Sequence, residues 1–189
     1  MKGRELLIGV SGGIAAYKTA TLVSRLVQAG AGVTVIMTRS ATQLVAPKTF
    51  EALTGRPVSM RVFGPKAHPH IELAQEADLL CIAPATANIL AKAAYGLADD
   101  LLSTIYLSFP NQVLMAPAMN CVMWQKPSVQ RNVAQLRADG VVLLDPEEGY
   151  LSCGMRGPGR MAEPETIFRV IAEQLTGPNA RRRVQGSGQ

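Results

Sequence analysis

The sequence of 189 residues has few of the residue types that build metal sites and disulfide frameworks. It contains three cysteines, Cys81, Cys121 and Cys153, and two histidines, and it has no Cys-x-x-Cys pair. An odd number of widely spaced cysteines does not make a disulfide framework, and this set offers poor ligands for zinc. We therefore expect no metal site and a reducing compartment.

The chain also lacks a long hydrophobic run. No apolar segment approaches the roughly 20 residues that a bilayer-spanning helix needs. Residues Met1 to Glu5 lead straight into a strand-like run, without the apolar core of a cleavable secretory signal. We therefore expect a cytoplasmic protein that does not bind membranes.

Aromatic residues make up only 5% of the chain, whereas 48% of its residues are hydrophobic, so the expected core is aliphatic. The formal net charge is +5, and part of it lies in Arg181, Arg182 and Arg183. A nucleic-acid surface needs basic residues on one folded face with aromatic residues among them, and the sequence offers no such stripe. We expect one domain over residues 1–176, a disordered basic tail over 177–189 and no nucleic-acid partner.

Short apolar runs alternate with helical patterns along the chain. The runs that predict buried strands are Leu6 to Val10, Val33 to Met37, Leu79 to Ala83, Val113 to Ala116 and Val141 to Leu144. Helices are predicted over 14–29, 71–77, 86–95, 99–107, 127–138 and 164–175, with short helical segments within 38–46 and 48–54. Acidic residues are expected in the first turn of the helix over 99–107. This alternation predicts an α/β fold, with a parallel sheet covered by helices on both faces.

Small polar residues follow three of the predicted strands. Ser11-Gly12-Gly13 follows the first strand and suits an anion at the start of a helix. It is not a GxGxxG sequence, which disfavours a nicotinamide dinucleotide. Thr38 and Ser40 follow the second strand, and Thr86 and Asn88 follow the third. Each alone is an ordinary helix cap, but together at one sheet edge they favour a phosphorylated planar ligand.

The histidines and cysteines include two candidates for proton transfer. His70 begins a helix with an apolar pattern and could act as a base, whereas His68 is expected on the surface. Cys153 lies in a Gly- and Pro-rich segment, 145–159, which we expect to be a loop of functional length. A thiol there could close over a ligand and donate a proton. Cys81 and Cys121 fit packing roles better.

The segment Pro117 to Trp124 places an Asn, two Met and the only Trp directly after a strand. Alone it is compatible with an apolar helix start. It also resembles the PxMNxxMW signature of the homo-oligomeric flavin-containing cysteine decarboxylases. The chain is similar to that family in four further motifs, in the same order along the sequence: Ser11 to Lys18, His70-Ile71, Ala83 to Asn88 and Cys153 to Met161. The pair Met155-Arg156 departs from the family pattern, in which a smaller or acidic pair is expected.

The resemblance implies a Rossmann-like three-layer flavoprotein fold and the cofactor FMN. It implies flavin contacts from Ser11, Gly12, Gly13, Thr38, Ser40, Thr86, Ala87, Asn88 and Ile89. It further implies three catalytic residues: His70 as the base, Asn120 as the group that holds the substrate carboxylate, and Cys153 as the proton donor. Met119 and Cys153 are implied to contact the substrate with Asn120.

Within the family, the motifs are most similar to the branch that converts phosphopantothenoylcysteine to phosphopantetheine in coenzyme A biosynthesis. The implied reaction oxidises the substrate thiol, releases CO₂ and then reduces the resulting enethiol. The resemblance also implies a homotrimer or a trimer of trimers with the flavin site between subunits. Because the chain ends soon after Leu175, the synthetase of bacterial relatives is expected on a separate or lost domain.

Three other functions are compatible with parts of this pattern. The first is oxidative decarboxylation of a peptide's terminal cysteine, which needs no returned hydride and therefore no proton donor such as Cys153. The second is flavin prenyl transfer, which leaves the Met-Asn motif unexplained. The third is a non-catalytic FMN-binding regulatory role, in which the His or the Cys is dispensable.

Overall fold

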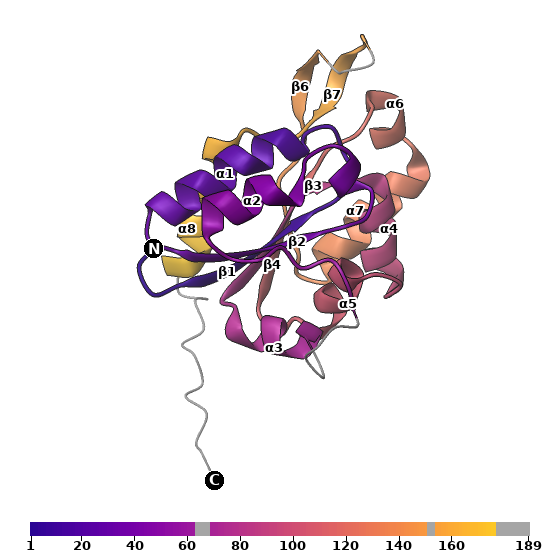
Figure 1. Cartoon of the computed structure of the whole chain (residues 1–189). Coiled ribbons are helices and arrows are strands. Elements are labelled where there is room, and N and C mark those ends of the chain that lie inside the picture. The colour runs from indigo at the N-terminus through magenta and orange to yellow at the C-terminus, as the bar shows by residue number, and fades with distance from the viewer. Residues whose placement is uncertain (63–68, 151–153, 177–189) are drawn as a thin grey trace.

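A computed structural model describes residues 1–62, 69–150 and 154–176. Its centre is a sheet of five strands that all pair in parallel, in the order β2-β1-β3-β4-β5. The strands are β1 (Glu5–Val10), β2 (Gly32–Met37), β3 (Leu79–Ala85), β4 (Gln112–Pro117) and β5 (Val142–Leu143) (Figure 1). All seven residues of β3 are buried, as expected for the central strand of a doubly covered sheet. The predicted α/β fold with a parallel sheet is confirmed.

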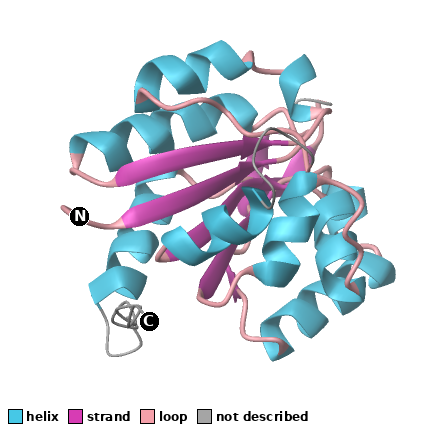
Figure 2. Ribbon diagram, turned by 60° about the horizontal axis from the view of Figure 1, so that its bottom comes forward, coloured by secondary structure: helices cyan, strands magenta, loops and turns pink. Residues whose placement is uncertain are grey.

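Helices cover both faces of this sheet, which gives the three layers of a Rossmann-like fold (Figure 2). One face packs against α1 (Ala16–Gln28), α2 (Pro47–Thr54) and α8 (Pro164–Thr176). The other face packs against α3 (Pro69–Glu76), α4 (Ala87–Tyr95), α5 (Leu101–Ser108) and α7 (Pro127–Ala138). The buried side chains are mostly Leu, Ile, Val and Ala, so each face of the sheet has its own aliphatic core. Two short helices, η1 (Ala41–Gln43) and α6 (Cys121–Trp124), follow β2 and β4.

The prediction that residues 145–159 form a loop is wrong. The segment contains two strands, β6 (Glu147–Tyr150) and β7 (Arg156–Arg160), which pair in an antiparallel hairpin that projects beyond the main sheet (Figure 1). Their residues are mainly Glu, Gly, Arg and Pro, which are poor strand formers. The pairing depends instead on tertiary contacts. A Cβ added to Gly157 would lie 3.1 Å from Cβ of Cys121, and the N–H of Met119 donates to the Gly159 carbonyl at 3.0 Å.

Helix α5 begins two residues later than its sequence predicts. Asp99 and Asp100 do not lie in its first turn, because Asp100 is the N-cap. Its carboxylate accepts the N–H of Ser103 at 2.9 Å, and the Ser103 hydroxyl accepts the N–H of Asp100 at 3.2 Å. This reciprocal capping box satisfies two backbone donors at the start of the helix.

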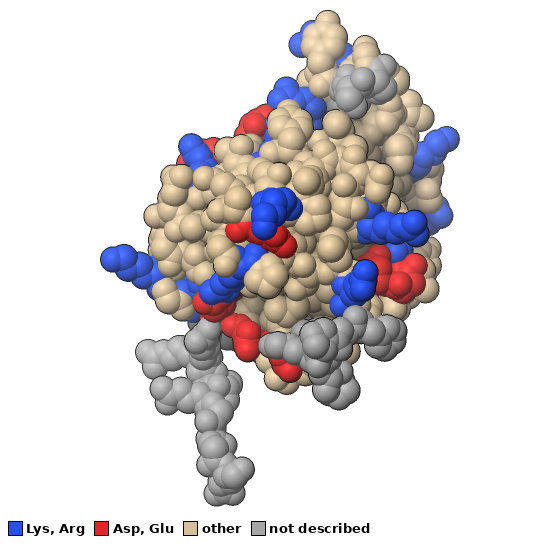
Figure 3. Space-filling model, in the orientation of Figure 1, with Lys and Arg blue, Asp and Glu red and all other residues tan. Residues whose placement is uncertain are grey.

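The visible surface carries interspersed charges. Figure 3 shows Lys and Arg next to Asp and Glu on the face that it draws, without a continuous basic stripe. Among the described residues, no helix is both long enough and apolar enough to cross a membrane.

Candidate functional site

A cavity of about 960 Å³ opens where the loops that follow β1, β2, β3 and β4 meet. Because the four strands are parallel, their carboxyl ends share one edge of the sheet, where open α/β sheets bind ligands. The structure brings together at this cavity all the residues that the sequence predicts for the cofactor, together with two predicted for the substrate: Ser11, Gly12, Gly13, Thr38, Ser40, Thr86, Ala87, Asn88, Ile89, Met119 and Asn120.

The glycine turn after β1 touches the loop after β2. A Cβ placed on Gly12 would lie 2.4 Å from Cβ of Ser40 and 3.2 Å from its carbonyl carbon. A Cβ on Gly13 would lie 3.3 Å from both Pro84 and Thr86. The absence of a side chain at Gly12 therefore allows the two loops to pack together at the wall of the cavity.

Ser11 joins the end of β1 to the start of α4. Its buried hydroxyl donates to the Pro84 carbonyl at 2.7 Å and accepts the N–H of Thr86 at 3.1 Å. Thr86 is the N-cap of α4, but its own side chain makes no capping hydrogen bond. The Thr38 hydroxyl accepts the N–H of Ala41 at 3.3 Å, but the N-cap of η1 is Ser40, whose side chain makes no capping hydrogen bond. Ser40 and Thr86 therefore occupy N-cap positions without using their hydroxyl groups as caps.

Asn120 is both a helix cap and a residue of the cavity wall. Its carbonyl oxygen accepts the N–H of Val122 at 2.8 Å, which caps α6. Its amide nitrogen lies 3.4 Å from the sulfur of Met155, next to the hairpin. Since the cap fixes the oxygen, the rotation of the amide is fixed as well. The side chain is therefore held with its N–H donors on the side of the hairpin.

An ion network connects the hairpin to the rest of the cavity. The carboxylate of Glu163 accepts hydrogen bonds from Lys18 at 2.6 Å and from Arg160 at 2.8 Å. The hydrogen bond from Lys18 is the main cause of the lowered pKa of Glu163, with a further contribution from Arg160. The N–H of Glu163 donates to the carboxylate of Glu147 at 3.1 Å. Three elements meet in this network: α1, the hairpin and the start of α8.

Lys92 forms a second charged cluster at the cavity wall. Its ammonium lies 2.6 Å from Asp99 and 2.7 Å from Asp100, and only 14% of its side chain is exposed. Burial opposes ionisation of Asp100, but hydrogen bonds from Lys92 and Ser103 outweigh it and lower the pKa of this carboxyl group. Asp100 therefore stays ionised beside Lys92.

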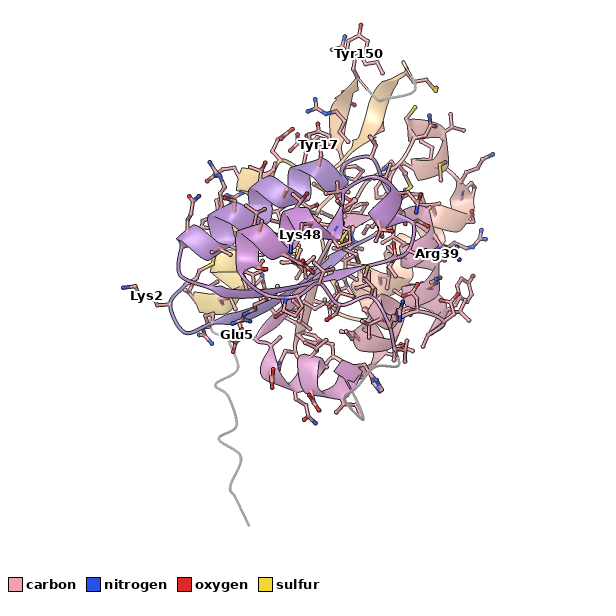
Figure 4. The ribbon with its side chains drawn as sticks, viewed as in Figure 1. Lys2, Glu5, Tyr17, Arg39, Lys48 and Tyr150 are labelled. Carbon is pink, nitrogen blue, oxygen red and sulfur yellow. The ribbon has the colours of Figure 1, made fainter. Side chains whose placement is uncertain are left out.

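Several cavity residues were not predicted as site residues from the sequence: Tyr17, Lys18, Arg39, Lys92, Met123, Tyr150 and Arg160. Figure 4 labels three of them, Tyr17 on α1, Arg39 after β2 and Tyr150 on β6. Helical spacing would have found Lys92, which lies four residues after Asn88 and hence on the same face of α4. Tyr150 and Arg160 were missed because their segment was predicted as a loop, although Arg160 lies within the Cys153 to Met161 motif.

Two predicted catalytic residues are not brought to this cavity by the described part of one chain. His70 lies on α3, is partly exposed and is not among the residues that line the cavity. Cys153 and His68 lie outside the described residues, so their predicted roles stay predictions. Cys81 and Cys121 are buried, and burial raises the pKa of the Cys81 thiol, which fits packing rather than chemistry.

Comparison with known sequences identifies a family and named relatives. The family described as Flavoprotein matches residues 1–176. The coenzyme A biosynthesis bifunctional protein CoaBC of Bacillus subtilis is 46% identical over 185 residues, which cover 94% of this chain and 46% of that protein. CoaBC of Mycobacterium tuberculosis strain H37Rv is 49% identical over 165 residues, which cover 87% of this chain and 40% of that protein. The chain thus spans about half the length of the curated relatives that it matches.

Solved structures share the fold over nearly the whole chain. A PPC decarboxylase mutant complexed with pantothenoylaminoethenethiol has a TM-score of 0.85 at 30% identity, covering 94% of this chain and 100% of that chain. The FMN-dependent cysteine decarboxylase SpaF has a TM-score of 0.81 at 35% identity, covering 93% of this chain and 98% of that chain.

The ion network at Glu163 makes the stability of the protein depend on pH in one direction. Because the folded-state pKa of Glu163 lies below its ordinary value of 4.5, its stabilising contribution is complete above that value and is lost as the pH falls through the lowered pKa. We expect Glu163→Gln to lower the free energy of unfolding by roughly 0.5 kcal/mol at neutral pH, since 43% of the side chain is exposed. The difference from the wild type should shrink on acidification.

Urea unfolding at several pH values measures this effect. Glu173→Gln is the matched control, because it removes an exposed carboxylate that, among the described residues, pairs with Arg169 on the same helix. A constant difference between wild type and Glu163→Gln over the acidic range would contradict the assignment.

Proposed function

The chain belongs to the flavoprotein family, and we propose that it is an FMN-dependent decarboxylase that acts on phosphopantothenoylcysteine in coenzyme A biosynthesis. The observation that carries this proposal is one cavity that combines the Ser11–Gly13 turn, the Thr86 helix start and Asn120. The CoaBC relatives and the PPC decarboxylase structure support the substrate, because their names state this pathway and this enzyme.

The residues present fit FMN. The volume of about 960 Å³ is in the range of cavities that hold a cofactor together with a small substrate. Gly12 and Gly13 leave the turn without side chains at the start of α1, where the helix dipole favours a phosphate. Ser40 and Thr86 add hydroxyl groups on either side of this turn. Ser11, Thr38 and residues 87–89 complete the set that would hold the flavin.

A plain cysteine amide has no electron sink for the loss of CO₂, so its thiol-bearing carbon must first be oxidised. FMN, when bound, would supply the acceptor for the hydride that this oxidation removes. Asn120 would hold the substrate carboxylate through its amide N–H groups, since its oxygen caps α6. A neutral donor binds the departing carboxylate less tightly in the ground state than an arginine would, and so opposes its loss less. His70 would take the thiol proton and Cys153 would return a proton to the enethiol.

A second copy of the chain would explain the position of His70. In one chain the cavity lacks this residue, while apolar side chains at the cavity remain exposed, namely Ile14 at 58%, Tyr17 at 61% and Met123 at 46%. Exposed apolar groups around a site are typical of protein interfaces. We propose a homo-oligomer, with the predicted trimer as its smallest form, in which His70 of one copy completes the cavity of another. The predicted cytoplasmic location stays a prediction.

Decarboxylation by the purified protein tests the proposed function. The wild type should contain about one FMN per chain and convert phosphopantothenoylcysteine to CO₂ and phosphopantetheine, measured by mass spectrometry. Asn120→Asp should keep the flavin but lower kcat/KM by about 100-fold or more, because its carboxylate repels that of the substrate. Gln28→Glu is the control, since it adds the same charge at an exposed position at the end of α1.

Three outcomes would redirect the interpretation. A wild-type protein that binds FMN but releases no CO₂ would favour the regulatory role. A product two hydrogens lighter than phosphopantetheine would favour oxidative decarboxylation without the returned hydride. Normal turnover by Asn120→Asp would remove this residue from the substrate site.

Co-expression of two inactive variants tests whether subunits share the site. His70→Asn and Asn120→Asp should each be inactive alone, because each lacks one catalytic group at every site. In mixed oligomers some cavities would receive His70 from one copy and Asn120 from another, so part of the activity should return. Inactive mixtures, with mixed oligomers verified by native mass spectrometry, would contradict a shared site.

A further inference from the structure

The charged side chains that line the cavity are mostly basic. In the described part of the chain they comprise four cations and one carboxylate: Lys18, Arg39, Lys92, Arg160 and Asp100. Lys18 and Arg160 share the carboxylate of Glu163, and Lys92 pairs with both Asp99 and Asp100. Three of the four cations are therefore compensated by carboxylates of the protein itself.

Arg39 is the exception. It forms no ion pair with any carboxylate of the described residues, and it is an exposed residue of the cavity lining. The backbone of Arg39 is held by its two neighbours in the sequence. Ser40 packs against Gly12, and the hydroxyl of Thr38 accepts the N–H of Ala41. The guanidinium of Arg39, beside the glycine turn, is thus the one cavity cation whose positive charge no carboxylate of the described residues balances. Its field favours a negatively charged ligand in the cavity.

We propose that Arg39 binds a phosphate monoester dianion in this cavity. The planar guanidinium donates two parallel N–H groups to a phosphate, with a geometry that a lysine ammonium does not reproduce. The neighbouring Ser40 hydroxyl is a further donor on the same loop. This inference rests on the proposed function, since both FMN and phosphopantothenoylcysteine carry such a phosphate.

The two phosphates make different predictions. If Arg39 binds the cofactor phosphate, its loss weakens FMN relative to riboflavin, which has the same ring system without the phosphate. If Arg39 binds the substrate phosphate, its loss weakens the binding of phosphopantetheine more than the binding of pantetheine. The contact of Ser40 with Gly12, at the start of α1, favours the cofactor phosphate.

Competition experiments on the holoenzyme distinguish these sources. Riboflavin is titrated against bound FMN with fluorescence as the readout, and binding of phosphopantetheine and pantetheine is measured by calorimetry. The preference for the phosphorylated member of one pair should fall about tenfold in Arg39→Gln and less in Arg39→Lys. Because the contact is exposed, this difference should narrow at high salt, where the screening length drops below about 10 Å.

Lys2→Gln is the matched control. It removes the charge of an exposed basic residue that does not line the cavity and that lies on the opposite side of the molecule from Arg39 in Figure 4. Its preferences for both phosphorylated ligands should equal those of the wild type. An equal loss in Lys2→Gln would overturn the role of Arg39, because a general change in net charge would then suffice.

The remaining outcomes are also decisive. An unchanged preference in both pairs for Arg39→Gln would overturn the inference, as would equal weakening of phosphorylated and unphosphorylated ligands. A wild-type protein that binds no flavin would contradict the proposed cofactor. The role of Arg39 would then be tested by the binding of phosphopantetheine and pantetheine alone. A wild-type protein that does not prefer phosphopantetheine over pantetheine would refute that role.

Discussion

The contact between Gly12 and Ser40 is the constraint on which the candidate site depends. It exists because β1 and β2 are parallel neighbours, so that the turn after one strand meets the loop after the other. A side chain at Gly12 would occupy the same space as Ser40 and force the loops apart. Ser11, in turn, ties this turn to Pro84 and Thr86 at the third strand. Three strand ends are thereby fixed around one cavity.

Much of the fold follows from local signals in the sequence. The apolar runs of β1 to β4 and the spacing of apolar residues in α1 predict elements that the structure contains, because continuous burial favours such runs. The hairpin of β6 and β7 could not be predicted in this way. Its pairing depends on Cys121 and Met119, which are distant in sequence and offer no local pattern. The start of α5 was displaced because Asp100 caps the helix instead of entering it.

The site was predictable where it follows from topology, and not where it follows from tertiary pairing. Residues that end parallel strands must share one edge, which places Thr38, Thr86 and Asn120 at the same cavity. The network of Lys18 with Glu163 joins residues 145 positions apart, and no spacing rule signals it. His70 shows the opposite case, because its motif predicts a catalytic role while the single chain leaves it outside the cavity lining.

The central claim is that the cavity built on Gly12 binds FMN, and the flavin content of Gly12→Ala tests it most directly. Gly9→Ala is the comparison, because its new Cβ would press on the end of the Leu102 side chain, away from the cavity. The account predicts that Gly12→Ala remains folded by circular dichroism but retains less than about a tenth of the wild-type FMN, while Gly9→Ala retains its flavin despite lower stability. Full FMN occupancy in Gly12→Ala, or equal loss in both variants, would contradict it.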